Sequence, residues 1–242
     1  MAHNFEKLFV FALKNEWQEL PKHYDLERDS DNKFLWHFSD HPGFAILQVG
    51  FGSQNAAEHF SDFVQNNKIK EVIHFGAAGG LATEQKEGEI FLPHKILSDQ
   101  GGRMVLEAPQ FRLVEKIRRA GLSYSAGTLF TSTHVLKNKS EKSAIAKEHQ
   151  ATSVDMESFP IAQICFKNKI IYTSARVIFD TINDNLEAIG EPSDQNGNVK
   201  ITRVATNIAK HPSLIIKIPS LKRKASLVQN QIVAMTKAVL GE

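Results

Sequence analysis

The sequence predicts an α/β fold organised as one domain of 242 residues. Short runs rich in apolar and β-branched residues, which are typical of buried strands, alternate with segments whose apolar residues recur at a helical period. Such alternation favours a sheet covered by helices. We find no linker and no internal repeat, so we expect residues 1–242 to form a single domain.

Residues 151–184 show this pattern most clearly. We expect a short strand at 153–155, a helix from Met156 and a buried strand at 170–178. Ligands of open α/β sheets bind at the carboxyl ends of strands, and acids that could share one pocket follow both of these strands. They are Asp155 and Glu157 after the first, and Asp180 and Asp184 after the second.

Composition predicts a soluble globular protein, with 42% hydrophobic and 23% charged residues. The formal net charge of +2 is too small to indicate a nucleic-acid partner. Cys165 is the single cysteine, which excludes an internal disulfide and fits a reducing compartment. We find neither a signal peptide nor a membrane span, so we expect a cytoplasmic protein.

The remaining elements follow from the same patterns. Before residue 151 we expect strands at 7–13, 34–38, 44–49, 72–75, 88–98 and 124–133, helices from Ser53, at 109–120 and at 140–149, the last of them solvated, and a flexible polar loop at 99–103. After residue 184 we expect a loop at 191–198 and helices at 199–210 and 220–240, joined by 211–219.

Glycine and other small residues follow two of these strands. Gly50 and Gly52 stand between a strand and a helix, where a turn can bring backbone N–H groups to a ligand, although a lone Gly-x-Gly is equally compatible with a plain tight turn. Residues 76–80 are all Gly or Ala, more than a turn requires, and leave room for a flat ligand. We take Gly52, Ala77 and Gly79 as candidate substrate-binding positions.

Two charged features have an ordinary structural interpretation. Glu16 follows the first strand, and its spacing alone favours a helix first-turn acid over a functional group. A basic cluster near the C-terminus usually forms a solvated helix face; contact with an anionic lipid surface is a minor alternative. This cluster comprises Lys217, Lys222, Arg223 and Lys224.

Over residues 7–184 the chain resembles the nucleoside phosphorylase superfamily, and most closely its 5′-methylthioadenosine/S-adenosylhomocysteine nucleosidase branch. The matching segments are FALKNEW, VGFGSQNAA, VIHFGAAGGLATEQKEGEIFLP, GTLFTSTHVL, ATSVDMESFPIAQIC and SARVIFDTIND. The resemblance implies a mixed, twisted sheet flanked by helices and cleavage of a purine N-glycosidic bond. It implies a nucleoside substrate, water as co-substrate, a homodimer, and neither a cofactor nor a metal.

The resemblance also implies roles for individual residues. Asp180 matches the acid that protonates purine N7, and Glu16 matches the base that activates water, with Arg176 beside that water. Met156 and Glu157 match the pair at the ribose. Val135 and Leu136 match the backbone that contacts the purine edge.

These residue types suit the reaction. Cleavage passes through an oxocarbenium-like sugar, so one acid must protonate the leaving purine and one carboxylate must deprotonate water. A third carboxylate at the sugar hydroxyls gains strength as positive charge develops. Burial can raise a carboxyl pKa enough to keep the acid protonated.

Hydrolysis and phosphorolysis remain alternatives at this point. Phosphorylases of the superfamily hold phosphate with arginines, one of which is replaced here by His74, and FALKNEW stands in place of their glycine-led phosphate loop. These replacements favour hydrolysis, because phosphate would have little cationic support. A binding module without turnover is the third reading, and the presence of Glu16, Arg176, Glu157 and Asp180 together speaks against it.

Departures from the family pattern concern the substrate. Val135 stands for a stacking phenylalanine, Ala77 for a serine and Phe179 for the serine before the catalytic acid, and residues 98–109 are fewer than in the methylthioadenosine enzymes. The DMES motif, the Gly-Gly-Arg loop and the basic C-terminal segment resemble, more weakly, the hopanoid-associated branch, which acts on adenosylated lipids. A homodimer is also favoured by the apolar helix residues Phe60 and Phe63, which need a partner or a core.

Overall fold

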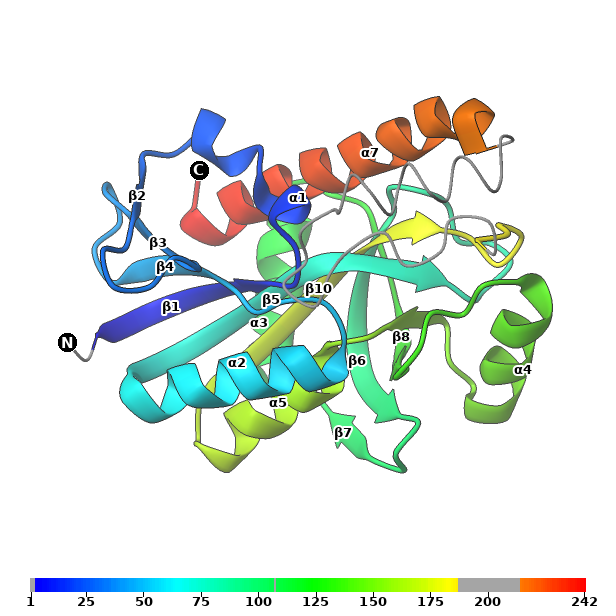
Figure 1. Ribbon diagram of the computed structural model, residues 1–242, viewed down its shortest axis with the longest axis horizontal. Helices are drawn as coiled ribbons and strands as arrows, with labels where there is room; N and C mark the ends of the chain where they lie inside the picture. The colour runs from blue at the N-terminus through cyan, green and yellow to red at the C-terminus, as the bar shows by residue number, and fades with distance from the viewer. Residues whose placement is uncertain (1–2, 107, 187–213) are drawn as a thin grey trace.

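The computed structural model describes residues 3–106, 108–186 and 214–242, and its strands form one ten-stranded mixed sheet with helices on both faces (Figure 1). The predicted fold class is therefore confirmed. The strands are β1 (Asn4–Phe11), β2 (Leu26–Arg28), β3 (Leu35–Phe38), β4 (Phe44–Gln48), β5 (Lys68–Gly80), β6 (Ile90–Ser98), β7 (Arg103–Val105), β8 (Tyr124–Thr131), β9 (Ser153–Asp155) and β10 (Ile171–Asp180).

The helices lie between these strands and at the C-terminus. They are α1 (Lys14–Trp17), the 3-10 turn η1 (Leu20–Lys22), α2 (Ser53–Asn66), α3 (Ala108–Arg119), α4 (Lys139–His149), α5 (Ser158–Lys167) and α7 (Leu214–Leu240). The predicted loop at 191–198 and helix at 199–210 lie outside the described residues. The C-terminal helix begins at residue 214, before the predicted start at 220, and contains Pro219.

The sheet closes on itself in one half and extends openly in the other. Strands β5, β10, β6, β8 and β9 pair in sequence, and β9 pairs again with β5, which completes a ring. From β5 the sheet continues through β1, β4 and β3 to β2. Strands β4, β1, β5 and β10 are parallel to one another, whereas β6 and β9 run antiparallel to their neighbours β10 and β5.

Alternation along the strands divides the core into two layers, because successive side chains point to opposite faces. Leu8 and Val10 of β1 belong to a layer that also contains buried residues of α2 and α5. Phe9 and Phe11 belong to the other layer, which contains buried residues of α1, α3 and α7. Figure 1 shows α2 and α5 together on one side of the sheet and α7 on the other. The sheet is therefore fixed from both faces.

Several local predictions are corrected. The strand predicted at 72–75 does not end there, because residues 76–80 continue β5, which runs to Gly80. The predicted loop at 99–103 is the tight connection into β7, and the short elements β2 and η1 have no counterpart in the prediction. Phe60 and Phe63 are buried in the chain's own core, so they give no reason to expect a partner.

The basic cluster is only in part the solvated face that the sequence predicts, because Lys222 and Arg223 are exposed whereas Lys224 is buried. Lys224 is 6% exposed and its Nζ lies 2.9 Å from Glu87 Oε1 and 2.7 Å from Asp184 Oδ1. Arg223 forms an ion pair with the same glutamate. Membrane-surface contact through this cluster therefore loses part of its basis. None of the helices formed by the described residues is long and apolar enough to span a membrane.

Candidate active site

A cavity of about 170 Å³ lies at the end of the sheet where β1, β5 and β10 finish. Most of the residues predicted from the sequence line it: Glu16, Ala77, Gly79, Val135, Leu136, Met156, Glu157 and Asp180. Gly52 and Arg176 are not among its lining residues, but both contact residues at the cavity. The acids of residues 151–184 thus share one pocket, as predicted, with the exception of Asp184.

Backbone amides that follow β1 or belong to β5 hold the carboxylate of Glu16. Its Oε2 accepts hydrogen bonds from the amides of Ala12 (3.0 Å) and Leu13 (2.9 Å), and its Oε1 accepts one from Ala77 (2.9 Å). Burial raises the pKa of this carboxyl, although the backbone hydrogen bonds and the nearby Arg176 oppose the rise. Glu16 does lie in the first turn of the short helix α1, as its spacing predicted, but it also lines the cavity.

Glu157 lies between β9 and α5 and reaches across to the turn before α2. The amide of Gly52 donates a 2.7 Å hydrogen bond to Glu157 Oε1, and Gly52 has a φ of +88°, which favours glycine. Burial and then the charge of Asp155 raise the pKa of Glu157 to about 8. Met156 is fixed beside it, because its carbonyl accepts a 2.5 Å hydrogen bond from Ser53 Oγ.

Asp180 is the last residue of β10 and sits at an irregularity of the strand. Ile178 pairs with Ala78 and Asp180 pairs with the next residue, Gly79, so that Phe179 has no opposite residue in this pairing. Bulges of this kind re-aim side chains next to functional sites. The carboxylate of Asp180 lies close to Gly79, since a Cβ on Gly79 would be 3.4 Å from Asp180 Oδ2, whereas the tighter neighbour of that Cβ would be Val154 Cγ1 at 3.0 Å.

Lys142 of α4 also lines the cavity, and the sequence did not predict it there. Its ammonium forms an ion pair with Asp180, and it donates a 2.7 Å hydrogen bond to the carbonyl of Thr181. Helix α4 was predicted to be solvated, yet Lys142 is 1% exposed. Its spacing from Ile145 and Ala146, which pack on a core cluster, was the available signal that Lys142 faces inward.

The pKa of Asp180 depends on two opposing effects. Burial raises it above the ordinary value of an aspartate, and the charge of Lys142 lowers it again without cancelling the rise. A carboxyl with a raised pKa retains a proton at higher pH. The arrangement can therefore supply a proton to a ligand in the cavity.

Arg176 of β10 pairs with Gly76 of β5 and is not among the residues that line the cavity. Its Nη2 is 2.8 Å from Asp155 Oδ2 and donates a 2.5 Å hydrogen bond to Ser158 Oγ, and the guanidinium contacts the ring of His74. Burial lowers the pKa of His74 well below its ordinary value, and Arg176 adds to this effect. The imidazole that replaces a phosphorylase arginine is therefore uncharged at neutral pH.

The side chains of Arg176 and Glu16 both closely approach Gly76. A Cβ at this position would lie 2.7 Å from Arg176 Nη1 and 2.8 Å from Glu16 Oε1. Real Cβ atoms essentially never approach other atoms so closely, so glycine leaves the space into which both charged groups reach. This close approach, and not a turn, explains the first of the small residues at 76–80.

Metal-ligating side chains do not gather at the cavity in the part of the chain that the structure describes. The single group of three such side chains found there, His3, Asp29 and His37, lies elsewhere in the fold. The charged side chains that line the cavity are buried carboxyl groups and one lysine that is paired with Asp180.

Breaking the Arg176–Asp155 pair should strongly destabilise the protein. We expect Arg176→Met to lower the free energy of unfolding by about 3–5 kcal/mol, because Asp155 would remain as a buried unpaired charge. Urea unfolding monitored by circular dichroism measures this loss. Arg118→Met, which removes one of the two arginine partners of Glu115 on the exposed face of α3, is the matched control and should leave the free energy of unfolding nearly unchanged.

Adding Asp155→Asn to Arg176→Met separates the two explanations for such a loss. If the unpaired charge is responsible, the double variant should recover part of the stability. Equal instability of the single and double variants would contradict this interpretation and indicate that Arg176 contributes through packing.

The chain is similar to known proteins both in sequence and in structure. A family model described as the phosphorylase superfamily matches residues 42–211. The 5′-methylthioadenosine/S-adenosylhomocysteine nucleosidase of Buchnera aphidicola subsp. Acyrthosiphon pisum is 26% identical over 231 residues, which cover 86% of this chain and 94% of that protein.

Solved structures share the fold at lower identity. A mutant of the nucleosidase MTAN from Helicobacter pylori, with 5′-methylthioadenosine in its active site, superposes with a TM-score of 0.70 at 10% identity and covers 97% of this chain and 99% of that one. Futalosine hydrolase of the same species superposes with a TM-score of 0.68 at 12% identity, over 96% of this chain and 97% of that one.

Proposed function

The chain belongs to the phosphorylase superfamily, and we propose that it is a purine nucleosidase that hydrolyses the N-glycosidic bond of an adenosine-type nucleoside and releases adenine. The observation that carries this proposal is the convergence of Glu16, Glu157 and Asp180 on one cavity. The named nucleosidase relative from Buchnera, matched along almost its whole length, supports a substrate of the methylthioadenosine or S-adenosylhomocysteine type.

In the proposed reaction Asp180 is the general acid. Its proton goes to N7 of the purine while the bond between the sugar and the purine breaks, and the bonding electrons leave with the base. Burial favours the protonated form that this step requires. Lys142 is placed to stabilise the carboxylate that remains after the proton has left.

Glu16 is the proposed general base. It takes a proton from water, whose oxygen then bonds to the sugar carbon that the purine has left. Its two oxygens are oriented by three backbone amides, so the carboxylate needs no rearrangement before the reaction. The family resemblance implies that Arg176 lies beside this water. We propose that Arg176 is a positioning residue, which is held by its ion pair with Asp155 and lies against Gly76, close to Glu16.

Glu157 and Met156 are the proposed ribose contacts. Glu157 lies at the cavity with Gly52 fixing one oxygen, which leaves the other for the sugar hydroxyls. We propose that Val135, Leu136, Ala77 and Gly79 form the purine side of the same cavity. Binding at the sugar would strengthen as the oxocarbenium character develops.

Hydrolysis is supported over phosphorolysis by the charges around the cavity. Among the described residues that line it, Lys142 is the only lysine or arginine, and it is paired with Asp180. Arg176 is paired with Asp155, and His74 is uncharged at neutral pH. A phosphate ion would therefore find no unengaged cation among these groups.

We expect adenine release from 5′-methylthioadenosine in buffer without phosphate, at a rate that added phosphate does not increase. Chromatographic quantification of adenine, with and without phosphate and over a panel of 5′-substituted adenosines, measures this. Release only with phosphate would indicate a phosphorylase. Ligand binding without release under either condition would indicate a binding module.

Asp180→Asn should nearly abolish turnover and leave ligand binding largely intact. Asparagine keeps the shape of aspartate and can hydrogen-bond purine N7, but it cannot deliver a proton. Loss of a general acid typically costs roughly 10²–10⁴-fold in rate, and a loss confined to kcat indicates a transition-state role. Steady-state kinetics on one accepted substrate measures both parameters.

Two further variants serve as comparisons for Asp180→Asn. Glu157→Gln should weaken both binding and rate, because the sugar is held before and during the reaction. Asp184→Asn removes a nearby carboxyl that bonds Thr181 and Lys224 instead of the cavity, and it should cost much less. If Asp180→Asn keeps more than about a tenth of wild-type kcat, Asp180 is not the proton donor.

We also propose a homodimer in the cytoplasm, on the family resemblance and on the buried free thiol of Cys165, which suits a reducing compartment. Phe166 of α5 and Phe111 of α3 are exposed by 76% and 68% and are better candidates for a subunit contact than Phe60 and Phe63. Light scattering at micromolar concentration measures the state, and a monomer would contradict the dimer.

A further inference from the structure

Two imidazoles and a carboxylate meet at the edge of the sheet, far from the cavity along β1. His3 immediately precedes β1, Asp29 follows β2, and His37 belongs to β3. One ligand atom from each side chain lies within 4.8 Å of the other two. The cavity residues Ala12 and Leu13 follow the opposite end of β1, so these three side chains have no place in the proposed reaction.

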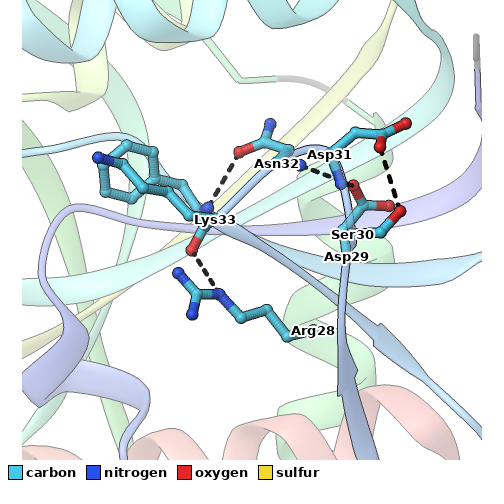
Figure 2. A pocket seen from close by; sticks show the side chains of 7 residues that line it. Arg28, Asp29, Ser30, Asp31, Asn32 and Lys33 are labelled. Atoms are coloured by element: carbon cyan, nitrogen blue, oxygen red, sulfur yellow. Dashed lines mark hydrogen bonds between the residues drawn. The ribbon is translucent and has the colours of Figure 1, made fainter.

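A single oxygen atom is shared between the two imidazoles. Asp29 Oδ2 lies 2.8 Å from His37 Nε2 and 3.4 Å from His3 Nε2. The other oxygen, Oδ1, accepts hydrogen bonds from the amides of Asp31 (3.0 Å) and Asn32 (2.8 Å), within the loop drawn in Figure 2. The loop therefore orients the carboxylate and directs Oδ2 to the histidines.

The backbone around all three residues is fixed. The amide of His3 donates to Asn67 Oδ1 (2.9 Å), and the carbonyl of His3 accepts from the amide of Lys68 (2.9 Å). His37 pairs with Glu27 of β2 and Ala45 of β4. The amide of Asp29 donates to the carbonyl of Leu35 (3.0 Å). Supported ligands of this kind are what a preformed metal site requires.

The ligand set suits a particular class of ion. Imidazole is a ligand of Zn²⁺, Cu²⁺ and Ni²⁺, and two histidines with one carboxylate, leaving a fourth position for water, is a common zinc arrangement. Zinc–ligand bonds of about 2.0–2.2 Å set tetrahedral ligand atoms roughly 3.3–3.5 Å apart. The His3–Asp29 separation fits this range, and an ion would replace the shorter hydrogen bond between His37 and Asp29.

We propose that His3, Asp29 and His37 bind a divalent transition-metal ion of the zinc class, which clips the start of β1 to the β2–β3 hairpin. The side chains of His3 and His37 are 34% and 33% exposed, so an ion can enter from solvent and keep a bound water. The ion closes a loop between residues 3 and 37. It therefore stabilises the edge of the sheet through the chain entropy of the unfolded state.

The test is a zinc titration of the full-length protein, prepared without an affinity tag and stripped of metal by a chelator. We expect isothermal calorimetry to give one Zn²⁺ per chain at micromolar concentration, and thermal unfolding to move to higher temperature with zinc. His3→Gln should weaken binding by more than the roughly 10–100-fold that loss of a supporting group alone costs, and should remove the thermal shift.

His23→Gln is the matched control, because His23 is an exposed histidine outside the group. It should bind zinc as the wild type does. His37→Gln provides a second ligand variant in case one substitution disturbs the fold. The proposal is overturned if the wild type binds no zinc, or if His23→Gln weakens binding as much as both ligand variants do. Neither outcome depends on whether the chain releases adenine.

Discussion

The buried ion pair between Arg176 and Asp155 is the interaction on which the geometry of the site depends. Arg176 extends from β10 and Asp155 ends β9, and both strands pair with β5, so the pair joins strands on either side of the one that carries Gly76. Their side chains are 2% and 1% exposed, and burying such charges is costly unless other hydrogen bonds complete the network. Ser158 and His74 supply such contacts to Nη2 of Arg176, whereas its buried Nε has no hydrogen-bond partner among the described residues. Because Gly76 has no side chain, the same guanidinium can lie close to Glu16. The ion pair is thereby placed next to a residue that lines the cavity.

Much of the fold was predictable because it follows from local patterns. The strand at 153–155 and the position of acids after strands were predicted and confirmed, since β-branched runs and helical periodicity depend only on neighbouring residues. Asp155 lies at the cavity as predicted, but the reason given for its position there, the shared edge of parallel strands, was incomplete. Strand β9 runs antiparallel to β5, so the acids do not meet simply because parallel strands end at one edge. They meet because the sheet closes into a ring, and closure depends on pairing between residues far apart in the sequence.

The features that the sequence could not predict are those that arise from contacts across the fold. Gly76 is a residue type common in turns, yet it lies within β5. The fold explains the glycine, because two charged side chains from separate elements approach it closely. Lys142 stands in a helix rich in polar residues; its spacing from Ile145 and Ala146 indicates that it faces inward, but its partner Asp180 is known only from the fold. Asp184 was grouped with the cavity acids, yet Thr181 and Lys224 bind its carboxylate. In each case a long-range partner decides the role of the residue.

The ion pair with Lys142 affects the ability of Asp180 to act as the proposed general acid. A lysine beside a carboxyl favours the ionised form, which opposes proton donation, whereas burial favours the protonated form, and burial is the larger effect here. A purine entering the cavity would displace water and strengthen both effects, since charges interact more strongly in a medium of low dielectric constant. Once the proton has moved to the purine, the carboxylate and the ammonium form a pair that favours the products of the transfer. The lysine therefore makes Asp180 a stronger acid than burial alone would allow, while burial raises the pKa of Asp180 above that of an ordinary aspartate.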